Sequence, residues 1–126
     1  MRCRTLMSGS SGNAVYFESE STRLLIDAGR SGKQISNALT THCEIQESQL
    51  NALLVTHAHR DHVAGIGILS RRYHIPVYAT EGTWTEMQPI TGLIPNELKN
   101  TFNKGLNLKL EHQIVLAGIG ERKKNG

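Results

Sequence analysis

The stretch that indicates the fold of this chain most clearly is Thr56-His57-Ala58-His59-Arg60-Asp61-His62. It holds three of the six histidines and one of the two aspartates in the sequence. It directly follows Leu53-Leu54-Val55, a continuous apolar run that predicts a strand buried on both faces of a sheet. The stretch therefore predicts metal-binding side chains on the loop after a central strand.

The spacing within this motif suits two neighbouring cations. Alternate side chains of an extended loop project the same way, so His57 and His59 can meet one cation. Asp61 and His62 can then serve a second cation beside it. Imidazole and carboxylate suit Zn²⁺ and also Mn²⁺ or Fe²⁺, so the ligand types do not fix the metal. The alternative is a polar loop without metal, whose histidines cap the following helix and whose Asp61 is the N-cap.

Strand and helix patterns alternate along the chain, which predicts an α/β fold. Three short runs predict an antiparallel meander of strands: residues 2–7, 14–18 and 23–27. A helix over 31–41 begins at Ser31 or Gly32. The later pattern predicts helix 62–73, strand 77–79, helix 80–87 with Thr80 as N-cap, helix 96–102 and strand 106–110. In helix 62–73, the residues expected to face inward are Ala64, Ile68 and Leu69.

Length and charge bound the class of protein. A chain of 126 residues with 38% hydrophobic and 20% charged residues predicts one globular domain. Residues 5–120 hold nine Lys and Arg against ten Asp and Glu, so the net charge of +3 comes from the ends and indicates no basic face. No apolar stretch is long enough to span a membrane, and no signal peptide is evident, so we expect a cytoplasmic protein without a membrane partner. Cys3 and Cys43 are expected to be reduced.

On these residues the chain resembles the metallo-β-lactamase superfamily. Residues 56–62 are similar to its signature loop, and Leu25-Ile26-Asp27-Ala28-Gly29 is similar to its first aspartate motif. Three more segments resemble the bacterial YycJ/WalJ-like branch: Ser8 to Ala14, Arg71 to Tyr78, and Thr83-Trp84. The resemblance covers about residues 4–105. It implies an αββα sandwich, a site for two divalent metal ions, and DNA exonuclease or phosphodiesterase activity.

The resemblance also implies a role for each motif residue. His57 and His59 would ligate the first metal, Zn or Mn, and the second would be held by Asp61 and His62. Asp61 would also steer the attacking water. Asp27 would lie behind the ligands and hold a ligating histidine by a hydrogen bond. The alternative role for Asp27 is to cap the turn at residues 29–32.

The Gly- and Ser-rich loop at residues 8–13 has two interpretations. Its backbone N–H groups, together with the side chains of Ser10, Ser11 and Asn13, could bind a phosphate of the substrate. By composition alone the loop is equally a flexible turn.

The chain also departs from the family pattern. No aspartate follows Asp61, so the aspartate that bridges the two metals in the family has no counterpart. The later histidines are His74, expected on the surface at a helix end, and His112. His112 is either a further metal ligand or a core or interface histidine. We therefore expect residues 1–126 to form a single incomplete domain. The complete fold would bind two divalent metal ions, whereas this chain alone would bind one ion weakly or none.

Two functions follow from these observations. The first is metal-dependent hydrolysis of a phosphodiester, with nucleic acid as the substrate. The alternative is a truncated or degenerate family member that binds metal weakly without turnover. Self-association is also expected, because the incomplete sandwich would expose apolar sheet surface such as Leu106, Leu108 and Leu110.

Overall fold

The computed structural model describes residues 2–102, and its centre is one six-stranded sheet with the strands in chain order. The first three strands pair antiparallel and confirm the predicted meander: β1 (Arg2–Met7), β2 (Ala14–Glu18) and β3 (Arg23–Ile26). The other three continue from β3 in parallel: β4 (Ala52–Leu54), β5 (Val77–Thr80) and β6 (Lys99–Phe102). The sheet therefore has an antiparallel half and a parallel half that meet at β3.

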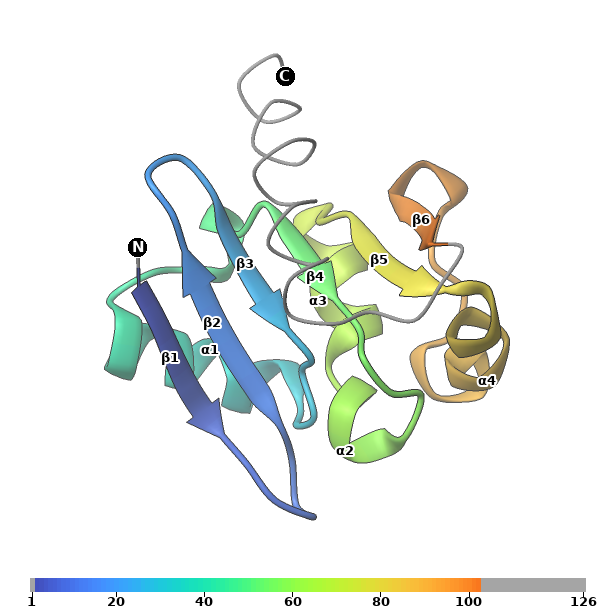
Figure 1. Ribbon diagram of the computed structural model, residues 1–126, viewed down its shortest axis with the longest axis horizontal. Coiled ribbons are helices and arrows are strands. Elements are labelled where there is room, and N and C mark those ends of the chain that lie inside the picture. Colours follow the sequence, from blue (N-terminus) through green and yellow to red (C-terminus); the bar gives the residue numbers. More distant parts are fainter. Residues whose placement is uncertain (1, 103–126) are drawn as a thin grey trace.

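Helices connect the parallel strands, because such strands need a crossover. The helices are α1 (Gly32–Cys43), α2 (Arg60–Val63), α3 (Ile66–Tyr73) and α4 (Glu81–Thr91), with 3₁₀ turns at Glu47–Gln49 and Asn96–Leu98. Figure 1 shows α1 and α3 behind the sheet and α4 beside its β5–β6 end. None of these helices is long and apolar enough to cross a bilayer, within the part of the chain that the structure describes.

Successive side chains of a strand point to opposite faces of the sheet, and here both faces carry apolar residues. Leu25, Leu53 and Val77 lie in the larger cluster, which includes Ile35 and Leu39 of α1. The opposite face carries a smaller cluster, formed by Leu24, Ala52, Leu54 and Tyr78. The central strands are thus buried on both faces, as the apolar run at 53–55 predicts.

Two of the predicted helix starts, at Ser31 and Thr80, are confirmed. Ser31 Oγ accepts a hydrogen bond from the backbone N–H of Gln34 at 3.3 Å, and the Gln34 side chain returns to the Ser31 backbone. Thr80 Oγ1 caps α4 by accepting from the backbone N–H of Thr83 at 3.2 Å. These polar residues satisfy N–H groups that a helix start leaves unpaired.

The structure corrects two predicted helices. Residues 96–102 form a 3₁₀ turn and then β6, because pairing with β5 outweighs the local helical pattern. The helix predicted over 62–73 is divided into α2 and α3 at Ala64 and Gly65, where Gly65 N–H donates to Ala28 O at 2.8 Å. Ile68, expected in the core, is 48% exposed. Strand 106–110 and His112 lie outside the described residues.

Candidate metal centre

The motif lies where the carboxyl ends of β3 and β4 meet at one edge of the sheet. The parallel register pairs Ile26 with Leu54, so Asp27 and the loop that begins at Thr56 leave the sheet side by side. The backbone N–H of Asp27 donates to Leu54 O at 2.7 Å and fixes this arrangement. Ligand sites of α/β sheets characteristically form at this edge.

Asp27 is the centre of the hydrogen-bond network at this edge. It is 5% exposed and has a left-handed backbone, with φ of 66°, which Asp tolerates better than most residues. Its Oδ1 accepts from the backbone N–H of Thr56 at 2.8 Å, and its Oδ2 accepts from Thr56 Oγ1 at 2.5 Å. His62 Nδ1 lies 2.7 Å from the same Oδ2. The carboxylate thus ties β3 to the motif loop and orients the His62 ring.

His57 and His62 face each other across the loop. Their ring centroids are 4.5 Å apart, with 42° between the ring planes. One ligand atom each of Asp27, His57 and His62 lies within 4.8 Å of the others, which makes these residues a candidate metal group in the described range. Because Nδ1 of His62 is held by Asp27, its Nε2 is the nitrogen that can bind a cation.

The other two motif residues are near this group without belonging to it. His59 is exposed and occupies the N-cap position of α2 without a side-chain cap hydrogen bond, which removes the predicted alternative of Asp61 as the N-cap. Asp61 lies instead in the first turn of α2. Its Oδ2 is 3.8 Å from His62 Nε2, and the predicted binding of one metal ion by Asp61 and His62 stays a prediction.

Asn13 connects the loop at residues 8–13 to the motif. Its backbone N–H donates to Asp61 O at 2.8 Å, and its side-chain Nδ2 donates to Gly9 O at 2.9 Å and to Asp61 O at 3.1 Å. Ser10 and Ser11 are exposed, and Ser11 Oγ accepts from Arg30 Nη2 at 2.9 Å. Of the three predicted substrate-binding residues, Asn13 is therefore held against the motif by hydrogen bonds to Asp61, and the two serines lie on the surface.

Gly29 lies where three segments cross beneath the motif. Its N–H donates to Asn13 O at 2.9 Å. A Cβ atom at this position would lie 1.8 Å from Asp61 O and 2.5 Å from Asn13 N, both of them backbone atoms. Only glycine therefore fits at this crossing.

Sequence reasoning gave no role to Thr56 or Arg30. Thr56 supplies two of the hydrogen bonds that hold Asp27. Its position directly after the apolar run 53–55, beside the aspartate that follows the neighbouring strand, is the signal that could have found it. Arg30 contacts the loop at residues 8–13, which is remote in sequence.

The donor set fits a divalent cation. Two imidazoles and a buried carboxylate come together, and within the described range the basic side chain that contacts Asp27 is His62 rather than Lys or Arg. A buried carboxylate without a fixed cation is costly unless other groups satisfy it. A cation bound through His62 would share that negative charge, because the imidazole transmits it by its hydrogen bond.

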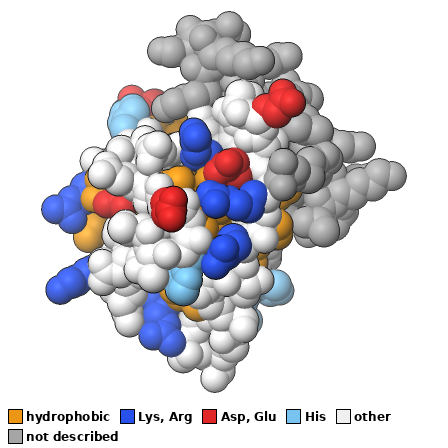
Figure 2. All heavy atoms as spheres, turned by 90° about the vertical axis from the view of Figure 1, so that its left-hand side faces the viewer, with side chains coloured by type: hydrophobic (Ala, Val, Ile, Leu, Met, Phe, Trp, Pro, Cys, Tyr) orange, Lys and Arg blue, Asp and Glu red, His pale blue; other side chains and the backbone are white. Residues whose placement is uncertain are grey.

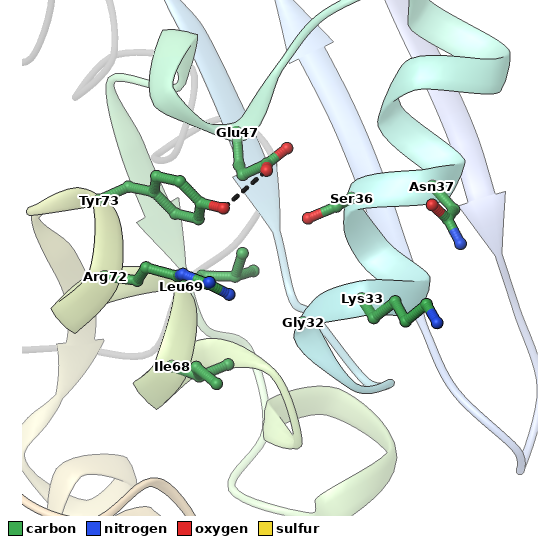
Figure 3. A pocket seen from close by; sticks show the side chains of 9 residues that line it. All are labelled: Gly32, Lys33, Ser36, Asn37, Glu47, Ile68, Leu69, Arg72 and Tyr73. Carbon is green, nitrogen blue, oxygen red and sulfur yellow. Dashed lines mark hydrogen bonds between the residues drawn. The ribbon is translucent and has the colours of Figure 1, made fainter.

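A cavity away from the motif lies between α1 and α3 and has a volume of about 320 Å³. Tyr73 OH donates to Glu47 Oε1 at 2.7 Å on one side of it, as Figure 3 shows. Burial alone would raise the pKa of Glu47, but hydrogen bonds from Tyr73 and from backbone, with the nearby Arg72 charge, lower it below the usual range. The motif residues 56–62 are not among those that line this cavity.

Comparison with known proteins places this site in a family. The sequence model of the metallo-beta-lactamase superfamily matches residues 7–120. Exodeoxyribonuclease YycJ of Bacillus anthracis is 44% identical over 100 residues, which are 79% of this chain and 38% of that protein. Exodeoxyribonuclease WalJ of Streptococcus pneumoniae is 41% identical over 102 residues, again 79% of this chain and 38% of that protein. The chain thus spans well under half the length of these relatives.

Solved structures agree on the fold. MEM-A1, a subclass B3 metallo-beta-lactamase from a soil metagenome library, is 22% identical with a TM-score of 0.63, over 82% of this chain and 44% of that one. BJP-1, a subclass B3 metallo-beta-lactamase of Bradyrhizobium japonicum, is 14% identical with a TM-score of 0.56, over 75% of this chain and 39% of that one. The predicted resemblance to the YycJ/WalJ-like branch is confirmed by the curated relatives. The chain belongs to the metallo-beta-lactamase superfamily and has its fold.

Proposed function

We propose that these residues serve a metal-dependent hydrolase that cleaves phosphodiester bonds of DNA as an exonuclease. The observation that carries the proposal is the group of Asp27, His57 and His62 at the sheet edge, in which two histidines of the motif at residues 56–62 meet the aspartate that follows β3. Two relatives with 41–44% identity are named exodeoxyribonucleases, which supports DNA as the substrate. A DNA substrate also agrees with the expected cytoplasmic location.

His57, His59, Asp61 and His62 would hold the divalent ions, two in the complete fold and of Zn or Mn type. When bound, such ions lower the pKa of a water molecule and stabilise negative charge on phosphoryl oxygens. The proposed role of Asp27 is to accept the Nδ1 hydrogen of His62, which leaves the Nε2 lone pair free for a ligand. Asp61 would accept a hydrogen bond from the attacking water, with its own position held by the Asn13 side chain 3.3 Å away.

The exposed hydroxyls of Ser10 and Ser11 are proposed to contact the substrate from the loop beside the motif. Asn13 supports this role indirectly, because its amide joins Gly9 to Asp61 and so keeps the loop next to the motif. Hydroxyl and backbone N–H groups on such a loop suit the oxygens of a phosphate.

The second candidate function is metal binding without turnover. The chain covers 38% of the length of each exodeoxyribonuclease, and no aspartate follows Asp61 to bridge two ions. On this alternative the 126 residues are an incomplete domain that holds one ion weakly.

The two functions can be separated by activity assays on the purified chain with Mn²⁺ or Zn²⁺. The substrates are a 5′-labelled DNA duplex, bis(p-nitrophenyl) phosphate and a chromogenic cephalosporin. We expect cleavage of both phosphodiesters that is abolished by a chelator, and no cleavage of the cephalosporin. Metal binding without any cleavage supports the second function, and cephalosporin turnover without phosphodiester cleavage contradicts the proposal.

Metal ligation is tested separately by calorimetry. His57→Ala and His59→Ala should each lose most of the bound metal, because each removes one imidazole from a small set of ligands. His42→Ala is the matched control, since His42 is an exposed histidine near the end of α1. Undiminished metal binding by the His57→Ala, His59→Ala double variant would show that the ligands lie elsewhere.

A further inference from the structure

Three arginines of the described range have a buried Nε–H group with no hydrogen-bond acceptor: Arg2, Arg23 and Arg30. Arg2 and Arg23 both lie beside Glu18, with nitrogen–oxygen distances of 3.1 and 3.8 Å. Among residues 2–102, no Asp or Glu forms an ion pair with Arg30. Arg30 therefore holds a positive charge that the described part of the molecule does not neutralise.

This charge is fixed next to the metal centre. Arg30 follows Gly29, whose backbone contacts Asn13 and whose Cα faces Asp61 O. The Arg30 side chain lies against Gly12, where a Cβ atom would be 2.6 Å from Arg30 Cγ and 3.0 Å from Nε. Its Nη2 donates to Ser11 Oγ at 2.9 Å. The guanidinium is thus held on the loop that adjoins the motif.

The N-terminus of α1 follows Arg30 in the chain and carries no negative charge in its first turn. The helix begins at Gly32, directly after Arg30 and the N-cap Ser31, and its first turn has no acidic residue. Its first turn instead carries Lys33, which is exposed and points away from the Tyr73–Glu47 pair in Figure 3. Helix N-termini favour anions and disfavour cations, so two cations here are unfavourable unless an anion joins them.

We propose that Arg30 is a substrate-binding residue that contacts a backbone phosphate of the DNA strand beside the metal centre. This inference rests on the proposed nuclease function and adds a residue outside the metal motif. A guanidinium offers several coplanar donors that match phosphate oxygens, and Ser11 occupies one of them. Burial of Nε removes part of the hydration of the group, which strengthens its attraction for an anion.

Binding of DNA without metal tests this role apart from catalysis. The affinity of a short fluorescent single-stranded oligonucleotide is measured by anisotropy in the presence of a chelator, over a range of salt concentrations. Arg30→Gln should weaken binding about tenfold and reduce the slope of log K against log salt by about 0.7, which is the share of one phosphate contact. Arg30→Lys should keep the slope and lose part of the affinity, because it retains the charge without the planar donors.

Two further variants show whether the affinity for the oligonucleotide depends on the position of Arg30 or only on the net charge of the chain. Lys33→Gln should weaken binding by at most about threefold, since Lys33 is an exposed cation in the first turn of α1 without a fixed contact to the loop at residues 8–13. Arg4→Gln removes the same charge from an exposed position on β1 and should change the affinity less than twofold. An equal loss in Arg4→Gln and Arg30→Gln overturns the proposal, because it shows an effect of net charge.

The outcome for Arg30 is independent of the outcome for hydrolysis. If the chain cleaves DNA and Arg30→Gln binds like the parent chain, the side chain only covers Gly12, and the inference is wrong while the proposed function stands. If the chain cleaves no phosphodiester but binds the oligonucleotide through Arg30, the proposed function fails and the anion site stands. Absence of any oligonucleotide binding by the parent chain at low salt overturns the site.

Discussion

Glu18 and Asp27 are two carboxylates of the same sheet in contrasting surroundings. Glu18 ends β2 in the antiparallel half, where Arg2, Arg23 and the hydroxyl of Tyr16 surround it. Asp27 follows β3 at the start of the parallel half and is held by Thr56 and His62. The first carboxylate has fixed cations from neighbouring residues, and the second has neutral donors and a histidine.

This difference in partners suits Glu18 to a structural role and suits Asp27 to its proposed role of orienting a metal-binding histidine. The charge of Glu18 is balanced by groups that are always present, so its interactions contribute to stability alone. On the proposed function, the charge of Asp27 would be balanced in part by a cation that the imidazole of His62 binds through its other nitrogen. Figure 2, which views the molecule from its β1 side, shows Lys and Arg side chains mixed with Asp and Glu, in agreement with a face of balanced charge.

On the Asp27 side of the sheet, the largest effect is expected from a substitution at Gly29. We expect Gly29→Ala to lower the free energy of unfolding by about 3 kcal/mol or more, because the new methyl group would overlap the backbone of Asp61 and Asn13. Gly82→Ala is the matched control: its Cβ would meet nothing within 4 Å in α4, and alanine favours a helix. Urea denaturation measures both. Equal stability of the two variants would contradict the crossing at Gly29.

Replacing each of the two carboxylates by its amide tests whether Asp27, and not Glu18, supports metal binding. Asp27→Asn should raise the metal dissociation constant about 10- to 100-fold, because the amide no longer holds His62 with a negative charge. Asn tolerates the left-handed backbone at this position, so a melting curve should show a folded protein. Glu18→Gln should leave the metal affinity within about twofold of the parent chain. Calorimetry with Zn²⁺ or Mn²⁺ decides, and equal losses in both variants would remove the distinction.

The parts of the fold that local sequence controls were predictable. Ser31 and Thr80 start helices because their hydroxyls satisfy N–H groups three residues later. The apolar run at 53–55 and the polar motif after it placed the site at the sheet edge. Contacts between distant segments were not predictable: β6 depends on pairing with β5, and the break before α3 depends on the bond from Gly65 to Ala28.

The positions of the side chains within the site also depend on backbone turns and strand pairing that the sequence pattern alone does not reveal. A spacing of two brings His57 and His59 to one side only while the backbone is extended. That extended stretch ends at His59, because α2 begins at Arg60 and turns the chain so that His62 comes back to His57. The partnership of Thr56 with Asp27 likewise depends on the parallel register of β3 and β4, which one strand pattern cannot reveal.

Alkaline pH should affect the Glu18 region through Tyr16. Burial, together with the hydrogen bond to Glu18, raises the pKa of Tyr16 to about 12. Below pH of about 10, the stability that this shift represents is fully present, and it falls as the pH rises from about 10 to 12, by about 2–3 kcal/mol. Tyr16→Phe should abolish most of that fall. Tyr73→Phe is the comparison variant: the hydrogen bond to Glu47 also raises the pKa of Tyr73, but Tyr73 is less buried than Tyr16, so most of the alkaline fall should remain.

Acid should have the smallest effect, through Glu18 itself. The hydrogen bond from Tyr16 and the charges of Arg2 and Arg23 lower the pKa of Glu18 below its usual value of 4.5, against a smaller opposing effect of burial. A lowered pKa in the folded state means that the added stability is complete above about pH 4.5 and is lost as the pH falls through the folded value. Glu18→Gln should therefore be less stable at neutral pH by under about 1 kcal/mol, since the ion pairs are half-exposed, and the difference should vanish in acid. Urea denaturation at several pH values measures this, with the exposed Glu20→Gln as control. A difference that persists unchanged at low pH would show that Glu18 acts through packing rather than through its charge.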